Sequence, residues 1–124
     1  MHTTTIIAAT SIIFILLDSI YLYFMSSYFN NQIKIVQGST IKLNMVAAIL
    51  CYISLIFGLY YFILKDKRSI VDAFLLGLVI YSVYDLTTLA LLKNWFVTTA
   101  IIDSLWGGIL FALTTTFVYK LSNR

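Results

Sequence analysis

The stretch IVDAFLLGLVIYSVYDLTTLALL, residues 70–92, is followed after the three residues KNW by FVTTAIIDSLWGGILFALTTTFVY, residues 96–119. An α-helix needs about 20 residues to cross the roughly 30 Å of hydrocarbon in a bilayer, and each segment is long enough. Because the connection is so short, the two helices must run antiparallel and pack as neighbours. The stretch therefore predicts a helical hairpin that spans a membrane.

Two further apolar segments, Thr4–Met25 and Asn44–Leu64, meet the same length criterion. The whole chain is 61% hydrophobic and only 10% charged, against about 25% charged residues in an ordinary soluble domain. A water-soluble fold of this size could not bury so much apolar surface. We therefore predict an all-α fold, a four-helix transmembrane bundle that forms a single domain over residues 1–124 in the lipid bilayer of a cell membrane or a viral or host membrane.

The distribution of Lys and Arg predicts the orientation. The N-terminus, the Lys65–Ser69 connection and the C-terminus are predicted on one side, and they carry more basic residues (Lys65, Lys67, Arg68, Lys120 and Arg124) than the other connections (Lys34, Lys42 and Lys93). Both termini are therefore expected on the cytoplasmic side. The long connection Ser26–Leu43 is rich in apolar residues, and we expect it to lie along the membrane surface.

Several classes of function find no support in the sequence. The basic residues form no stripe with interleaved aromatics of the kind that binds nucleic acid. The single cysteine excludes an internal disulfide, and the lone histidine at position 2 offers no metal-binding cluster. We therefore expect no nucleic-acid partner, no metal and no cofactor.

Small residues recur at helical spacing in the second and fourth spans. Such rows let helix backbones approach closely in lipid, where no hydrophobic force drives association between helices. We expect them to form helix–helix contacts, within the bundle or between copies in a homo-oligomer. The residues concerned are Ala47, Cys51, Ser54, Gly58, Ala100, Ser104, Gly107, Gly108 and Ala112.

Three of the five acidic residues, all of which are aspartates, fall inside predicted spans. Asp18, Asp85 and Asp103 each lie about seven residues from the same predicted end of their spans, which is roughly 10 Å inside the boundary at 1.5 Å per residue. Each charged aspartate costs about 2.5–3.5 kcal/mol at a helix centre. Three such costs at one depth indicate a functional layer.

Polar and aromatic residues lie beside these aspartates at helical spacing. The third span has them one turn on either side of Asp85, the fourth has a tryptophan one turn after Asp103, and Tyr21 follows Asp18 by one turn. The second span enters from the same side with an asparagine and a tyrosine. The candidate ligand- or proton-binding residues are Asp18, Asp85, Asp103, Tyr52, Tyr81, Asn44, Thr88 and Trp106.

The predicted pocket contains no Lys, Arg or His that could neutralise its carboxyl groups. Low dielectric and neighbouring like charges both favour the protonated form, so at least one aspartate should hold a proton near neutral pH. Such a cluster can bind a cation, pass a proton or act as a general acid. Alternatively, the polar groups only hydrogen-bond one another and fix the helices in register.

These residues stand in short strings: LD at 17–18, YSVYDLT at 81–87 and DSLWG at 103–107, with Asn44, Ala47, Ala48 and Tyr52 in the second span. In these strings the chain resembles an uncharacterised family of predicted membrane proteins, domain of unknown function 2177, found in bacteria and some large DNA viruses. Thr88 stands where that family commonly has asparagine, Tyr21 stands near a common tryptophan, and the Lys65–Ser69 connection lacks the usual proline. The resemblance implies a four-span membrane fold and no particular activity.

The pattern leaves three functions open. The best supported is the binding or relay of a proton, a cation or a small ligand. Conduction across the membrane would require an oligomer, because four short helices are few for a channel. An intramembrane enzyme could instead use a protonated aspartate for acid–base chemistry on a lipid or isoprenoid. A structural or assembly role would need only the polar contacts themselves. No residue pair in the sequence identifies a catalytic nucleophile.

Overall fold

The computed structural model describes residues 2–38, 44–92 and 94–122. They form four helices that are long and apolar enough to cross a membrane, which confirms the predicted fold class. Helix α2 ends in a π-helical turn, η1, and the two together make one span of 20 residues. The elements are α1 (Thr3–Gln37), α2 (Met45–Leu59), η1 (Tyr60–Leu64), α3 (Ile70–Leu91) and α4 (Val97–Ser122).

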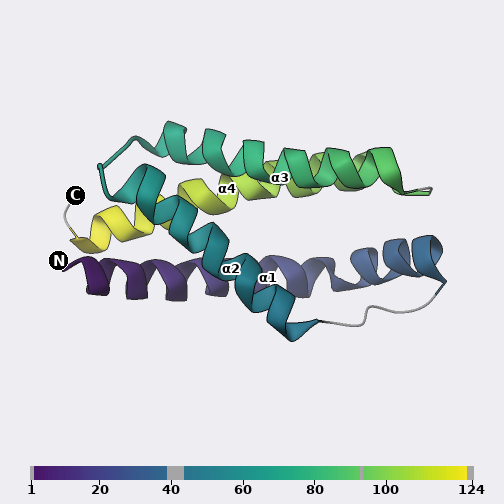
Figure 1. The fold of residues 1–124 in the computed structure, drawn as a ribbon, viewed down its shortest axis with the longest axis horizontal. Helices are drawn as coiled ribbons and strands as arrows, with labels where there is room; N and C mark the ends of the chain where they lie inside the picture. Colours follow the sequence, from purple (N-terminus) through teal and green to yellow (C-terminus); the bar gives the residue numbers. More distant parts are fainter. Residues whose placement is uncertain (1, 39–43, 93, 123–124) are drawn as a thin grey trace.

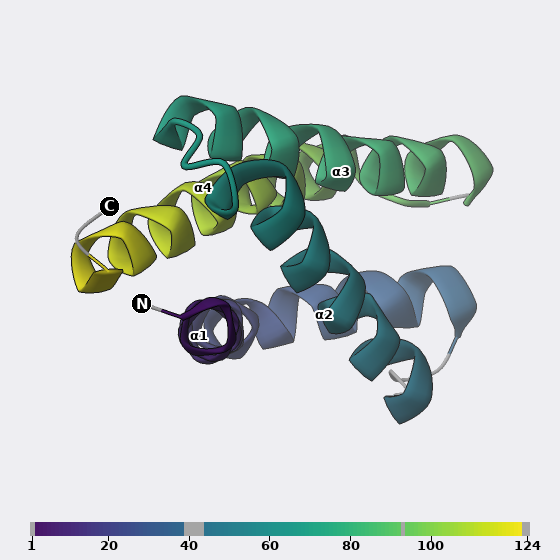
Figure 2. The same ribbon diagram turned by 60° about the vertical axis from the view of Figure 1, so that its left-hand side comes forward.

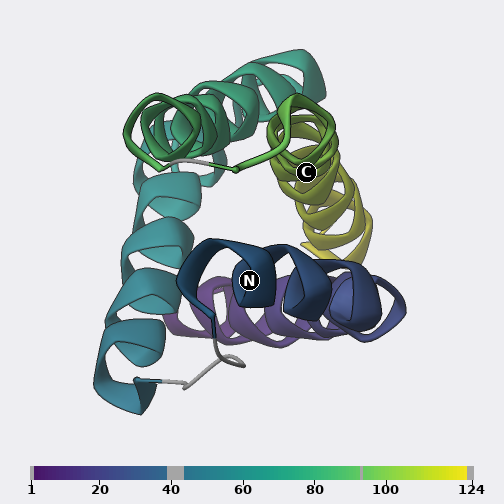
Figure 3. The same ribbon diagram turned by 90° about the vertical axis from the view of Figure 1, so that its right-hand side faces the viewer.

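The hairpin predicted from the shortest connection is the most closely packed part of the structure. Helices α3 and α4 lie side by side and antiparallel, and α1 packs along α4 on its other side (Figure 1). Helix α2 crosses the others obliquely (Figure 2). Seen end-on, the four helices surround a common centre (Figure 3). The start of α1 and the end of α4 lie at the same end of the bundle, as an even number of spans requires (Figure 1).

Helix α1 corrects the prediction for the first span and its connection. We expected the helix to end near Met25, but it continues to Gln37, so most of the Ser26–Leu43 segment is helical. Its 35 residues are about 52 Å long, well beyond the hydrocarbon thickness. The polar residues after Met25 lower helix propensity by only a few tenths of a kcal/mol each, which tertiary contacts readily override. The helix stops at Gly38, whose φ of 77° is left-handed and whose N–H bonds to Lys34 O.

Glycines allow α3 and α4 to approach closely. A Cβ on Gly77 would collide with the backbone carbonyl of Gly107, and a Cβ on Gly107 would collide with the ring of Tyr81. A Cβ on Gly108 would come within 2.7 Å of the Phe74 ring. The small residues of α4 therefore lie in the helix contact, where the close approach of the two backbones supplies the packing that lipid does not.

The small-residue row on α2 faces elsewhere. Ala47, Cys51 and Ser54 are exposed, and a Cβ on Gly58 would have no atom within 4 Å. Because α2 crosses its neighbours obliquely, it contributes Ile56 and Leu59 to the core. No close helix contact runs along this row within the described chain, so its expected role in contacts between copies stays a prediction. Spacing alone shows that a row exists but not which side of the helix meets a neighbour.

Candidate functional site

Two of the three predicted intramembrane aspartates are deeply buried, and the third is partly buried. Asp18 on α1 is 7% exposed and Asp85 on α3 is 1% exposed, whereas Asp103 on α4 borders a cavity. Burying a carboxyl group is costly unless hydrogen bonds compensate it. The partners of each carboxyl group therefore show how the site is built.

Asp18 joins three helices through its two carboxyl oxygens. Tyr52 on α2 donates its hydroxyl to Oδ2 at 2.5 Å, and Trp106 on α4 donates its indole N–H to Oδ1 at 3.0 Å. Each carboxyl oxygen of Asp18 therefore accepts one hydrogen bond. Asp18 is thus held by two side chains, Tyr52 and Trp106, that the sequence analysis listed as candidates.

Asp85 and Asp103 form a second group on the α3–α4 hairpin. Ser104, the residue after Asp103 on α4, donates its hydroxyl to Asp85 at 3.5 Å, so Asp85 lies against the part of α4 that carries Asp103. Tyr21 donates its hydroxyl to Asp103 at 3.3 Å. Both bonds are long for a hydroxyl donor, so these two carboxyl groups are less well compensated than that of Asp18.

A stacked aromatic pair connects the two carboxyl groups of α1 and α4. The rings of Tyr21 and Trp106 are parallel to within 3°, with centroids 4.5 Å apart. Tyr21 bonds to Asp103 and Trp106 bonds to Asp18, so each ring carries one donor of the site. The sequence analysis noted Tyr21 one turn after Asp18, on the same face of the helix, but did not list it among the candidate binding residues.

The prediction that the three aspartates lie at one depth counted residues from an end of the first span near Met25. Since α1 continues to Gln37, that reference point does not apply to Asp18. Asp18 is bonded to Trp106, and Tyr21, one turn further along α1, is bonded to Asp103. Equal depth in the bilayer stays a prediction.

Three other nominated residues are placed as follows. Tyr81 packs its ring on Gly107 and lines a cavity together with Asp103. Asn44 is exposed and caps α2, where its side chain accepts a bond from Ala47 N at 3.1 Å. Thr88 donates to the carbonyl of Tyr84 in its own helix at 2.9 Å. The side chains of Asn44 and Thr88 thus bond to backbone groups of their own helices. Neither side chain has a described contact with a carboxyl group of the site.

Gln32 is a structural residue that the sequence analysis missed. It is 1% exposed, and its amide oxygen accepts bonds from Phe96 N at 3.0 Å and Thr99 Oγ1 at 2.9 Å. Its amide nitrogen donates to Asn94 O at 2.9 Å. Gln32 therefore ties the extension of α1 to the start of α4, where the first backbone N–H groups of a helix need partners. The sequence analysis had placed Gln32 in a connection along the membrane surface, so no contact with another helix was expected for it.

The basic side chains stay away from the aspartate cluster. Within residues 2–38, 44–92 and 94–122, the one salt bridge joins Arg68 to the surface residue Asp72 at 3.0 Å. The carboxyl groups of Asp18, Asp85 and Asp103 are therefore compensated by hydroxyl and indole donors, not by a cation from the described chain.

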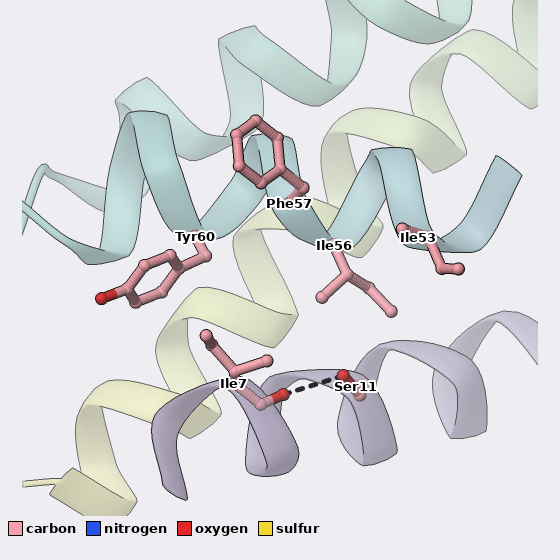
Figure 4. A pocket seen from close by; sticks show the side chains of 6 residues that line it. All are labelled: Ile7, Ser11, Ile53, Ile56, Phe57 and Tyr60. Carbon is pink, nitrogen blue, oxygen red and sulfur yellow. Dashed lines mark hydrogen bonds between the residues drawn. The ribbon is translucent and has the colours of Figure 1, made fainter. Parts of the chain in front are cut away.

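Two cavities lie beside α2, and they differ in chemistry. One, of about 240 Å³, separates α1 from α2 and has no acidic lining (Figure 4). Its Ser11 hydroxyl bonds back to Ile7 O at 2.8 Å (Figure 4). The other, of about 300 Å³, lies between α2 and α3 and reaches Asp103. Only the second cavity brings lipid-accessible space to a carboxyl group of the cluster. Its lining residues are Cys51, Leu55, Ile80, Tyr81, Tyr84 and Asp103.

Comparison with known proteins agrees with this architecture. The profile of a family described as predicted membrane protein, DUF2177, matches residues 3–120, which include nearly all of the four helices and every residue of the cluster. Neither the curated proteins nor the solved structures include a significant match to the chain. The extent of the profile match shows that the chain belongs to the DUF2177 family of predicted membrane proteins.

Proposed function

We propose that this membrane protein binds and releases a proton or a small cationic or hydrogen-bond-donating ligand at Asp85 and Asp103, beside the well-bonded Asp18. The observation that carries the proposal is the weak hydrogen bonding of Asp85 and Asp103, whose hydroxyl donors Ser104 and Tyr21 lie 3.5 and 3.3 Å away. A purely structural polar contact would give each acceptor a close donor, as Tyr52 and Trp106 do for Asp18. Two weakly bonded carboxyl groups on adjacent helices instead leave a position for a proton or a cation.

The surroundings support binding and release more than conduction across the membrane. Asp103 borders a cavity, whereas hydroxyl groups deeper in the bundle are bonded within their own helices or lack a partner. Thr10 donates to Ile6 O at 2.6 Å, and Thr114 Oγ1 is buried without a partner within the described residues. The described polar groups therefore form no continuous path from Asp103 to the other end of the bundle.

A second candidate is an intramembrane enzyme that acts on a lipid or isoprenoid. The apolar lining of the cavity beside Asp103 favours it, because a protonated carboxyl group at the end of an apolar pocket can serve as a general acid. Turnover of a lipid by the purified protein, abolished by Asp103→Asn, would distinguish this function from binding alone.

We expect Asp85 and Asp103 to share one proton at neutral pH. Difference infrared spectroscopy should then detect a protonated carboxyl group at pH 7 in the wild-type protein. The signal should disappear in Asp85→Asn and in Asp103→Asn, since the amide becomes the donor and the remaining carboxyl group can ionise. Asp72→Asn is the matched control and should retain the signal, because Asp72 lies at the surface. A wild-type spectrum with only ionised carboxylates at pH 7 would overturn the proposal.

We further propose that both termini face the cytoplasm, which the excess of Lys and Arg at their end of the bundle supports. In a Cys51→Ala background, Lys67→Cys should react with a membrane-impermeant maleimide only after the cells are permeabilised. Gln37→Cys should react in intact cells. Reaction of both positions in intact cells would contradict the four-span arrangement, and the reverse pattern would invert the orientation.

A further inference from the structure

We infer that the ligand of this site is a lipophilic ammonium ion, a single-chain amine that enters from the lipid between α2 and α3. The inference rests on the function proposed above and adds a chemical class and a route of entry. Its basis is the 300 Å³ cavity, which has an acidic end and an apolar body. A volume of this size is at the lower end of small-molecule pockets, which span about 300–1,000 Å³.

The cavity opens to the lipid-facing surface of the bundle. Tyr84 is 64% exposed, and Cys51 is also exposed, so these two residues form its mouth on α3 and α2. Leu55, Ile80 and Tyr81 are only partly exposed and form its body. Neighbouring exposed residues of the same helices are large and apolar, including Leu50, Ile53 and Val83. A ligand therefore reaches the cavity from within the bilayer.

The inner end of the cavity selects for a positive charge. Asp103 lines it, and Asp85 lies against the same part of α4, where Ser104 donates to it at 3.5 Å. No basic side chain of the described chain pairs with either carboxyl group. An ammonium group supplies both the missing charge and several N–H donors, and hydrogen bonds between charged partners are the strong ones. The rings of Tyr81 and Tyr84 can also attract a cation.

The rest of the cavity selects for an apolar chain. Its lining outside Asp103 consists of aliphatic side chains, two tyrosines and a thiol. A metal ion would need several oxygen ligands, and the described residues hold no group of three acidic, histidine or cysteine side chains positioned for one. A charged head with a hydrocarbon tail satisfies both ends of the cavity at once.

Cys51 allows occupancy to be measured without any substitution, because it is the only cysteine of the chain and lies at the mouth. The full chain would be placed in phosphatidylcholine nanodiscs, and alkylation of Cys51 by a lipid-soluble maleimide would be followed. Dodecylamine should slow the reaction. Its half-protecting concentration should be lower than that of dodecanol by about tenfold or more, as expected for one charge-assisted contact.

Two variants test where the amine binds. Asp103→Asn should remove the difference between amine and alcohol, while Asp72→Asn should preserve it. Val79→Cys in a Cys51→Ala background controls for general effects of a charged amphiphile on the bilayer, because Val79 is exposed outside the cavity lining. The amine should not protect this position. The wild-type comparison of the two amphiphiles stands even if Asp103→Asn fails to fold.

Equal protection by dodecanol and dodecylamine would overturn the inference, because the cavity would then accept any apolar chain. Absence of protection by either compound would also overturn it. These failures are distinct from failure of the proposed function. A shared proton seen by infrared spectroscopy together with equal protection would retain the carboxyl site and exclude the lipophilic amine.

Discussion

Gly77→Ala should abolish stable folding, or cost about 3 kcal/mol or more, although it adds one methyl group. The new Cβ would collide with the backbone carbonyl of Gly107, which cannot rotate away as a side chain can. Overpacking of this kind typically costs about 1–3 kcal/mol, and more where a rigid group must move. Thermal unfolding in detergent, followed by circular dichroism, measures the change.

Gly58→Ala is the matched control, since Gly58 also lies in an apolar span but has open space where a Cβ would stand. It should be neutral or stabilising, because alanine is about 1 kcal/mol better than glycine in a helix. Equal destabilisation by both substitutions would show that the close contact between α3 and α4 is not what holds the bundle together.

Asp18→Ala should destabilise the protein by about 2–5 kcal/mol. The substitution leaves the Tyr52 hydroxyl and the Trp106 indole without their acceptor, and each unsatisfied buried donor costs about 1–3 kcal/mol. Asp18→Asn should cost less, since the amide retains one acceptor. Unfolding free energies of Asp18→Ala, Tyr52→Phe and the double variant form a cycle that isolates the interaction.

Asp85→Asn provides the contrast within the same cluster. It replaces a buried, weakly bonded acceptor with an amide that carries a donor, so it should leave stability unchanged or raise it while removing the shared proton. Asp72→Ala, at an exposed surface pair, should change stability little. If Asp85→Asn were as destabilising as Asp18→Ala, all three carboxyl groups would serve the fold in the same way.

The sequence alone predicted that the chain has four spans, and the bounds of three of them closely, because the signal for a span is local. Lipid requires about 20 apolar residues for each crossing, and three of the predicted intervals agree with the helices to within about three residues. The sequence also identified Asp18, Asp85 and Asp103 as candidate site residues, because ionisable residues inside a membrane span are rare and usually functional. The error in α1 arose where the local signal weakened. After Met25, the helix is stabilised by hydrogen bonds that join the side chains of Tyr28 and Gln32 to the start of α4 and the residues before it. Because these partners are distant in sequence, no local pattern reveals the bonds.

Which residues meet was decided by the tertiary structure. Helical spacing predicted the same kind of contact for the small-residue rows on α2 and α4. The crossing of the helices leaves open space beside Gly58 and places Gly107 against the ring of Tyr81. Likewise, composition placed three aspartates in lipid. The packing gave Asp18 two close donors and left Asp85 and Asp103 with more distant ones. The physical reason is that hydrophobicity and helix propensity act along the chain, whereas hydrogen-bond pairing and steric fit depend on the rotation and crossing angle of whole helices.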